Sequence, residues 1–319
     1  MLQYLPTEII LSIASHATPE TKGTIAQTCH TCYSAIVPLL WRYLPLKAIE
    51  NVDGVVNRLI RNNWIARATQ FVHAITLTSD SVSHNTLEEI QTLIGAMESG
   101  YPYILDGHPG APPFEPSILP AKTKAVKKSF GDAVLELIHH FPRTSYFTFD
   151  YYLALPYLLT SQSTSLDDTT AITTTTTTSF NGSLTISHYR PNQIQDLLLL
   201  LAPFTQLTEL SIQAQEALSY SDDKDAWSVG DADMLQLSEI SMDQLEKLTI
   251  IGVDDHVELD VYRTLIESKP RLKSLTLKWR YRPKNVYILA LENLVDKFLG
   301  WQFNRIEADN RYIFCLTRS

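Results

Sequence analysis

The chain has 319 residues, of which 45% are hydrophobic, and its formal net charge at pH 7 is −9. This length and composition allow a sizeable buried core, arranged as two or three domains or as one long array of repeats. The acidic balance makes nucleic acid and anionic membranes poor partners for the surface as a whole, so we expect neither. Three cysteines leave an odd number, which favours a reducing intracellular compartment, cytoplasmic or nuclear, over a disulfide framework.

Neither a targeting segment nor a membrane span is expected. Pro6 and Glu8 interrupt the apolar start of the chain, and no basic region precedes them. The longest uninterrupted apolar run, residues 197–202, is far shorter than the roughly 20 residues that span a bilayer.

Residues 1–46 have the pattern of a small unit of three helices. Pro6 precedes a run with apolar residues on one helical stripe, Thr18-Pro19-Glu20 ends that helix and starts a second, and a third begins near His30. A unit of about 40 residues is too small to be stable alone, and its wide apolar stripe predicts a surface that binds a partner. The residues expected on the apolar faces are Ile9, Ile10, Ile13, Ala14, Ala17, Ile25, Ala26, Cys29, Tyr33, Ile36, Val37, Leu40 and Trp41.

The order of several short motifs in this unit resembles an F-box of the fungal type. The matching pieces are Leu5-Pro6-x-Glu8-Ile9, Ile13, Ile25-Ala26-Gln27-Thr28-Cys29, Tyr33 and Pro38-x-Leu40-Trp41-Arg42. One departure is Thr21-Lys22-Gly23, where the family usually has an aspartate-leucine pair. The resemblance implies a helical unit that binds the Skp-type adaptor of a cullin-RING ubiquitin ligase. The adaptor contacts that it implies are Leu5, Pro6, Glu8, Ile9, Ile13, Leu40 and Trp41.

The chain after this unit alternates between helical and extended patterns. Residues 47–70 have the pattern of a helical linker, and β-branched residues at alternate positions predict a strand over 71–77. Further along, helices are predicted over 86–97 and 130–141 and a strand over 146–149. Three segments have compositions that favour disordered insertions, near 101–125, 161–183 and 214–234; the second contains six consecutive threonines, Thr173–Thr178.

A repeated motif predicts the architecture of residues 71–319. Leu207-x-x-Leu210-x-Ile212 recurs from Leu245 and again from Leu272, and Leu184-x-Ile186 is a shorter copy upstream. The interval from Leu245 to Leu272 lies within the roughly 20–29-residue period of leucine-rich repeats. The positions where that family has asparagine or cysteine are occupied by Gln215, Val253 and Arg280. Helices are predicted between the motifs, over 193–201 and 259–267, and after the last, over 287–299. The expected fold is therefore α/β: a small helical F-box followed by an irregular leucine-rich-repeat solenoid of βα units with a parallel sheet.

Side chains that alternate with the buried leucines define a candidate binding face. In a strand successive side chains point to opposite faces, so the residues between the leucines point outward. Arg282 and Lys284 extend the basic end of this face, which favours an acidic or phosphorylated target segment. The alternative is an ordinary solvated face that binds no partner. Instead of a target, the acidic loop around residues 222–233 of the same chain is a candidate to cover the basic end of this face. The target contacts predicted on this face are Ser211, Lys247, Thr249, Thr276, Lys278 and Arg280.

No motif in the chain predicts catalysis, a cofactor or a metal site. Cys29-His30-Thr31-Cys32 is the nearest to a redox or zinc motif, but two cysteines three apart on a helix are compatible with packing, and one other cysteine is too few for a four-cysteine site. The glycines at 95 and 100 are not followed by the lysine of a phosphate-binding loop.

Three functional hypotheses remain, from three classes. The first is a substrate receptor that links an unknown target protein to a cullin ligase and performs no chemistry itself. The second is a repeat scaffold whose first helices cap the repeats, without a ligase role. The third is an enzyme with an unrecognised site, which would need a deep pocket lined by perturbed titratable groups.

Overall fold

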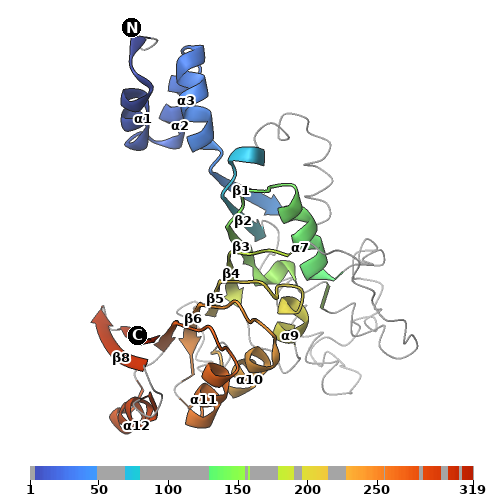
Figure 1. Ribbon diagram of the computed structural model, residues 1–319, viewed down its shortest axis with the longest axis vertical. Helices are drawn as coiled ribbons and strands as arrows, with labels where there is room; N and C mark the ends of the chain where they lie inside the picture. The colour runs from blue at the N-terminus through green and yellow to red at the C-terminus, as the bar shows by residue number, and fades with distance from the viewer. Residues whose placement is uncertain are drawn as a thin grey trace, which may run out of the picture.

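A computed structural model describes most of the chain and places a helical unit at one end of a long sheet (Figure 1). The described residues are 4–48, 69–79, 129–154, 157–158, 179–189, 196–214, 228–254, 256–279, 283–295, 301–308 and 311–318. The predictions for residues 49–68, 86–97 and 101–125, and for the threonine run, lie outside these ranges. None of the helices within them has the length and apolar content needed to cross a bilayer.

Three helices form the N-terminal unit, as predicted: α1 (Thr7–Ser15), α2 (Pro19–Ala26) and α3 (His30–Leu40). The Thr18 hydroxyl accepts a hydrogen bond from the Thr21 N–H at 3.3 Å, which caps α2. The helices enclose a core of their own, separate from that of the sheet. The buried members of this small core are Ile10, Ala14, Ala26, Cys32, Ala35 and Ile36. The predicted burial of Tyr33 is wrong, because its side chain is 56% exposed on the outer side of α3.

The sheet has nine strands, and the first seven are parallel and follow one another across the sheet in chain order. They are β1 (Tyr43–Ala48), β2 (Ala74–Ser79), β3 (Tyr146–Asp150), β4 (Ser183–Tyr189), β5 (Glu209–Ala214), β6 (Lys247–Val253) and β7 (Ser274–Trp279). The last two, β8 (Trp301–Ala308) and β9 (Arg311–Arg318), form a hairpin whose second strand pairs antiparallel with β7. The protein is therefore mixed α/β, with parallel and antiparallel strands in one sheet.

Helices follow the strands and lie together on one side of the sheet, on the outside of its bend (Figure 1). They are α7 (Phe130–His139), α9 (Asp196–Leu201), α10 (Asp231–Glu239), α11 (Leu259–Glu267) and α12 (Asn285–Val295), with short 3-10 turns η2 (Thr69–Phe71) and η5 (Tyr151–Leu153). The predicted βα alternation is confirmed for the repeated motifs, and α11 has the predicted bounds.

Several elements differ from the sequence prediction. The predicted strand 71–77 begins only at Ala74, because residues 69–71 form the turn η2. The predicted insertion 214–234 overlaps the start of α10, and Val229 forms a bridge with Val253 of β6. The hairpin β8–β9 was not predicted. The insertion predicted over 161–183 extends as far as Ser183, which is the first residue of β4. Phe180, inside the predicted insertion, is buried.

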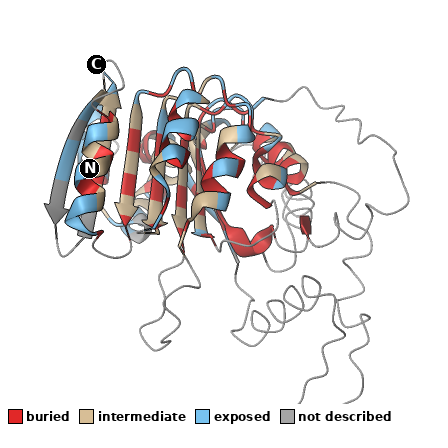
Figure 2. Cartoon of the chain, turned by 90° about the horizontal axis from the view of Figure 1, so that it is seen from below, coloured by how far each residue is buried: buried red, intermediate tan, exposed pale blue. Residues whose placement is uncertain are grey.

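The repeated leucines form the centre of the main core. Leu210, Leu248 and Leu275 are aligned by the register of β5, β6 and β7, and each is at most 2% exposed. Leu207, Leu245 and Leu272, which precede these strands, are fully buried. Burial alternates along β5 and β7, so one face of the sheet packs against the helices while the other carries partly exposed side chains (Figure 2). This division gives the sheet a free face.

Candidate functional site

A row of hydroxyl side chains crosses the free face of the sheet at one level. Register places Thr76, Thr148, Thr185, Ser211, Thr249 and Thr276 opposite one another on six adjacent strands, β2 to β7. We call these six residues the hydroxyl row; all are partly exposed. Since adjacent strands are about 4.8 Å apart, the row offers a regular line of donors and acceptors. The predicted contacts Ser211, Thr249 and Thr276 are brought together here, and three threonines that sequence reasoning missed extend them.

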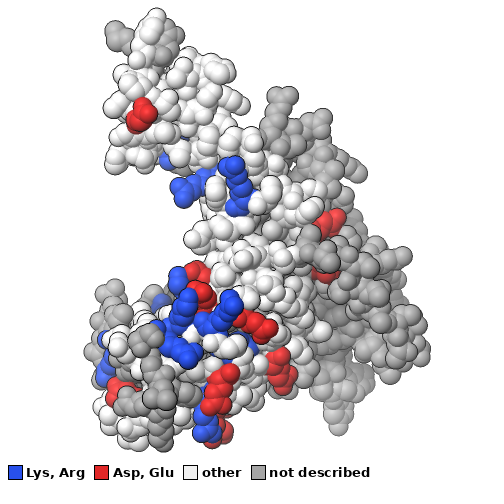
Figure 3. Space-filling model, in the orientation of Figure 1, with Lys and Arg blue, Asp and Glu red and all other residues white. Residues whose placement is uncertain are grey.

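The charges predicted on this face are partly balanced within it. The Lys247 ammonium donates to the Glu209 carboxylate on the neighbouring strand at 2.5 Å. That hydrogen bond raises the pKa of Lys247, so part of the positive charge predicted on this face is engaged within the face itself. Lys278 lies opposite Ile251 on β6 and Ile313 on β9. Arg280 and Arg282 lie outside the described residues. Over this part of the molecule acidic and basic side chains lie next to one another rather than in a single basic patch (Figure 3).

The helical unit keeps part of its apolar stripe exposed. Ile9 is 47% exposed and Ile13 is 46% exposed, on a stripe of α1 next to that of the buried Ile10 and Ala14. Pro6 and Glu8 are also exposed. Among the other predicted adaptor contacts, Leu5 and Leu40 pack partly against the small core of the unit, and Trp41 packs against the core of the sheet. The free apolar surface is therefore centred on Ile9 and Ile13.

A buried network of tyrosines and aspartates, which sequence reasoning missed, joins strands to helices. Tyr189, the last residue of β4, donates to Asp233 in the first turn of α10 at 2.5 Å. Its hydroxyl also lies 3.4 Å from Asp196 at the start of α9. The Tyr151 hydroxyl, just after β3, donates to the other oxygen of Asp196. Tyr189 and Tyr151 pack edge to face with ring centroids 5.0 Å apart. No local motif in the sequence marks these four residues as a group.

Burial shifts the acid–base behaviour of the network. Desolvation, together with the negative charge of Asp233, raises the pKa of Asp196 to about 7, although the hydrogen bond from Tyr151 opposes this rise. Desolvation also raises the pKa of Asp233, and it raises the pKa of Tyr189 well above 10. Gln236 of α10 completes the connection, since its side-chain oxygen accepts from the Leu197 N–H at 3.1 Å. All these polar groups are enclosed in the core, so the network ties α9 and α10 to the ends of β3 and β4.

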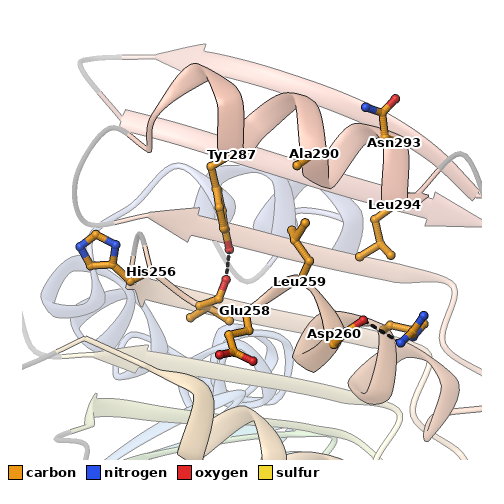
Figure 4. Close-up of a pocket in the computed structure, with 10 residues that line it drawn as sticks. His256, Glu258, Leu259, Asp260, Tyr287, Ala290, Asn293 and Leu294 are labelled. Atoms are coloured by element: carbon orange, nitrogen blue, oxygen red, sulfur yellow. Dashed lines mark hydrogen bonds and ion pairs between the residues drawn. The ribbon is translucent and has the colours of Figure 1, made fainter.

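A groove with a volume of about 530 Å³ lies between α11 and α12 (Figure 4). Its polar groups are engaged with one another: the Tyr287 hydroxyl donates to the Val257 carbonyl, and Arg263 pairs with Asp260 at 2.6 Å. His256 and Glu258 lie on its rim with side chains exposed to solvent. Within the described ranges no three His, Cys, Asp or Glu side chains are grouped closely enough to hold a metal ion.

Comparison with known proteins adds no family. No family model matches the chain, and no curated protein matches its sequence.

Proposed function

We propose that this chain is the substrate-recognition subunit of an SCF-type ubiquitin ligase. In this proposal the helical unit is an F-box that binds the Skp-type adaptor, and the remainder is an irregular leucine-rich-repeat solenoid that binds a target protein. The protein itself performs no chemistry; it holds the target near the transfer enzyme and so raises the effective concentration of the two.

The observation that carries the adaptor half is the exposure of Ile9 and Ile13 on a unit that already has its own core. Apolar side chains that remain free on a folded helical unit mark a binding surface, because their burial by a partner stabilises the complex. Pro6, Glu8 and the partly exposed Leu5 and Leu40 lie around them as further adaptor contacts. Trp41, packed on the core of the sheet, fixes the unit to the rest of the chain.

Strand order supports the target half. Seven parallel strands in chain order, with helices on the opposite side, are the arrangement that stacked βα repeats produce, and the free face of such arrays is their usual binding surface. The target contacts in this proposal are the hydroxyl row together with Lys247 and Lys278, and Arg280 by sequence. A hydroxyl-rich face favours an extended polar segment of the target, since each hydroxyl can both donate and accept.

The adaptor half is tested by co-purification of the chain with a purified Skp-type adaptor. Ile9→Ser with Ile13→Ser should abolish co-purification without unfolding the protein, because both side chains are already exposed. Truncation of central interface anchors costs about 2 kcal/mol or more. The matched control is Val286→Ser with Leu289→Ser, two exposed apolar residues on α12. If the wild-type protein does not retain the adaptor, the ligase role is refuted. The remaining hypothesis is then a repeat scaffold that has no ligase role.

The target half is tested by comparing the proteins that wild type and variants retain from cells. Thr249→Arg places a large charged side chain in the middle of the hydroxyl row and should remove the target while keeping the adaptor. Thr264→Arg makes the same change on the exposed side of α11, in the helical layer, and should remove neither. If both variants fail to retain the same proteins, the target does not bind through the hydroxyl row.

A further inference from the structure

The two cysteines of the N-terminal unit occupy different positions at the start of α3. Cys29 is the residue that precedes the helix, and its backbone is extended, with φ −164° and ψ 164°. Cys32 lies in the first turn and is fully buried in the small core. The expectation that both cysteines lie on one helix is therefore wrong for Cys29. Its side chain instead turns back over the first turn of α3, so that the Cys32 N–H donates to the Cys29 sulfur at 3.4 Å.

The environment of Cys29 favours its thiolate. The Cys32 N–H bond is the largest of several effects that lower the pKa of Cys29, followed by a bond from the Cys32 side chain. The Thr28 side chain and the Thr31 N–H add smaller effects in the same direction. Free N–H groups at a helix start stabilise negative charge, which is the general reason why cysteines at such positions react readily. Cys29 is also partly open to solvent, whereas Cys32 is not.

We propose that Cys29 and Cys32 form a thiol–disulfide exchange site, with Cys29 as the attacking thiol and Cys32 as the resolving thiol. The proposal rests on two observations of position. Cys29, partly open to solvent, directly precedes the helix. Cys32 lies in the first turn, where its backbone N–H hydrogen-bonds to the Cys29 sulfur at 3.4 Å. It does not depend on adaptor or target binding. The only other cysteine, Cys315 on β9, belongs to the opposite end of the sheet (Figure 1).

The co-reactant is a low-molecular-weight disulfide of the glutathione class. The Cys29 thiolate attacks one sulfur of this disulfide, the S–S bond breaks, and one thiolate leaves with the bonding electron pair. Cys32 then attacks the Cys29 sulfur, its proton passes to the leaving sulfur, the Cys29–Cys32 bond forms, and the second small thiol is released. Two protein thiols are oxidised and one small disulfide is reduced to two thiols, so atoms and electrons balance. A dithiol reductant reverses both steps.

The test exposes the reduced full-length chain to glutathione disulfide at pH 7, with acid quenching and mass analysis of the intact protein and its peptides. We expect a short-lived glutathione adduct on Cys29, followed by loss of two hydrogens and loss of alkylation at Cys29 and Cys32 after unfolding. Cys315, which is partly buried beside Thr276, should remain available for alkylation and serves as an internal reference.

Two variants separate the roles of the thiols. Cys32→Ser should keep a stable adduct on Cys29, and Cys29→Ser should give no adduct on Cys32, because Cys32 is buried. Circular dichroism checks that each variant folds; if Cys32→Ser does not, early quenching of the wild type still identifies the first cysteine to react. The proposal is overturned if the wild-type adduct on Cys29 persists without the internal disulfide, or if Cys29 reacts no faster than Cys315.

Discussion

The Tyr189 hydroxyl donates a hydrogen bond of 2.5 Å to the Asp233 carboxylate, and this bond joins the end of β4 to the start of α10. The two residues are 44 positions apart and both are buried. The same hydroxyl lies near Asp196, so one tyrosine stands between two carboxylates that would repel each other if both were ionised. Stability should therefore depend on pH in a way that a surface carboxylate could not produce.

The first prediction concerns the pH dependence of stability. Burial raises the pKa of folded Asp196 from 3.8 to about 7. Between these values the unfolded chain is ionised while the folded chain keeps the proton, so the contribution of Asp196 is fully present below about pH 4 and is lost as pH rises through about 7. Each unit of pKa difference is about 1.4 kcal/mol, so the loss amounts to a few kcal/mol. The raised pKa of Asp233 acts with the same sign.

Urea unfolding of the wild type and of Asp196→Asn, at about pH 4.5 and about pH 7.5, measures this effect. The advantage of the wild type over the variant should shrink as pH rises. Glu239→Gln, an exposed carboxyl at the end of α10, should leave the wild-type profile unchanged. Equal pH profiles for wild type and Asp196→Asn would show that Asp196 is ionised throughout.

The second prediction concerns the Tyr189 hydroxyl itself. Tyr189→Phe keeps the ring but leaves a buried oxygen of Asp233 without its donor, which should cost about 1–3 kcal/mol in the free energy of unfolding. Tyr146→Phe removes the same atom from a ring that is 57% exposed and should change stability by less than about 0.5 kcal/mol. Denaturant unfolding of both variants checks the difference; equal losses would show that the bond to Asp233 adds nothing.

The repeated motif allowed the centre of the fold to be predicted from sequence. Apolar residues at positions one, four and six of the motif have to face one core. This alternation predicted β5, β6 and β7 and the outward side chains between the apolar ones. The hairpin β8–β9 was missed because the alternation of apolar and polar residues that begins at Trp301 stops at Arg305, halfway along β8. Helix α10 was missed because it begins Asp231-Ala232-Asp233, which continues the acidic stretch before it.

The sequence predicted the residues of the candidate target site only where they occupy equivalent positions in several copies of the motif. Ser211, Thr249 and Thr276 align because they follow the same leucine in three copies. Thr76 and Thr148 lie on strands that carry no copy of the motif, so their place in the hydroxyl row depends on register that only the folded chain sets. The Tyr189–Asp233 bond is of the same kind, since neither residue belongs to the repeated motif.

The third prediction concerns Gly252 near the end of β6. Its φ of 86° lies in the left-handed region, and an added Cβ would lie 2.6 Å from the Cβ of Ala214. Gly252→Ala should therefore cost about 2 kcal/mol or more, from the backbone conformation and the clash together. Gly230→Ala meets no atom within 4 Å and is the matched control. Adding Ala214→Gly to Gly252→Ala removes the clash and should recover part of the loss; thermal unfolding that ranks Gly230→Ala as the more damaging change would contradict the prediction.

The last prediction concerns Lys269, which is 2% exposed. Its ammonium donates to the Ile240 carbonyl at 2.6 Å and lies 3.3 Å from the Ser238 carbonyl, at the end of α10.

Burial lowers the pKa of Lys269 from 10.5 to about 8, so the folded chain binds this proton less tightly than the unfolded chain does. The contribution of Lys269 is therefore present above its unfolded pKa and is lost as pH falls through about 8, the opposite direction to Asp196. From about pH 7.5 to about pH 9.5 the wild type should gain about 2 kcal/mol relative to Lys269→Met. This pH range lies below the titration of the buried tyrosines. Lys273→Met removes an exposed lysine that pairs with Glu246 at 2.7 Å, and its difference from the wild type should not change over the same range. Denaturant unfolding at the two pH values decides the matter, and parallel profiles for the wild type and Lys269→Met would mean that the buried amine keeps its ordinary pKa.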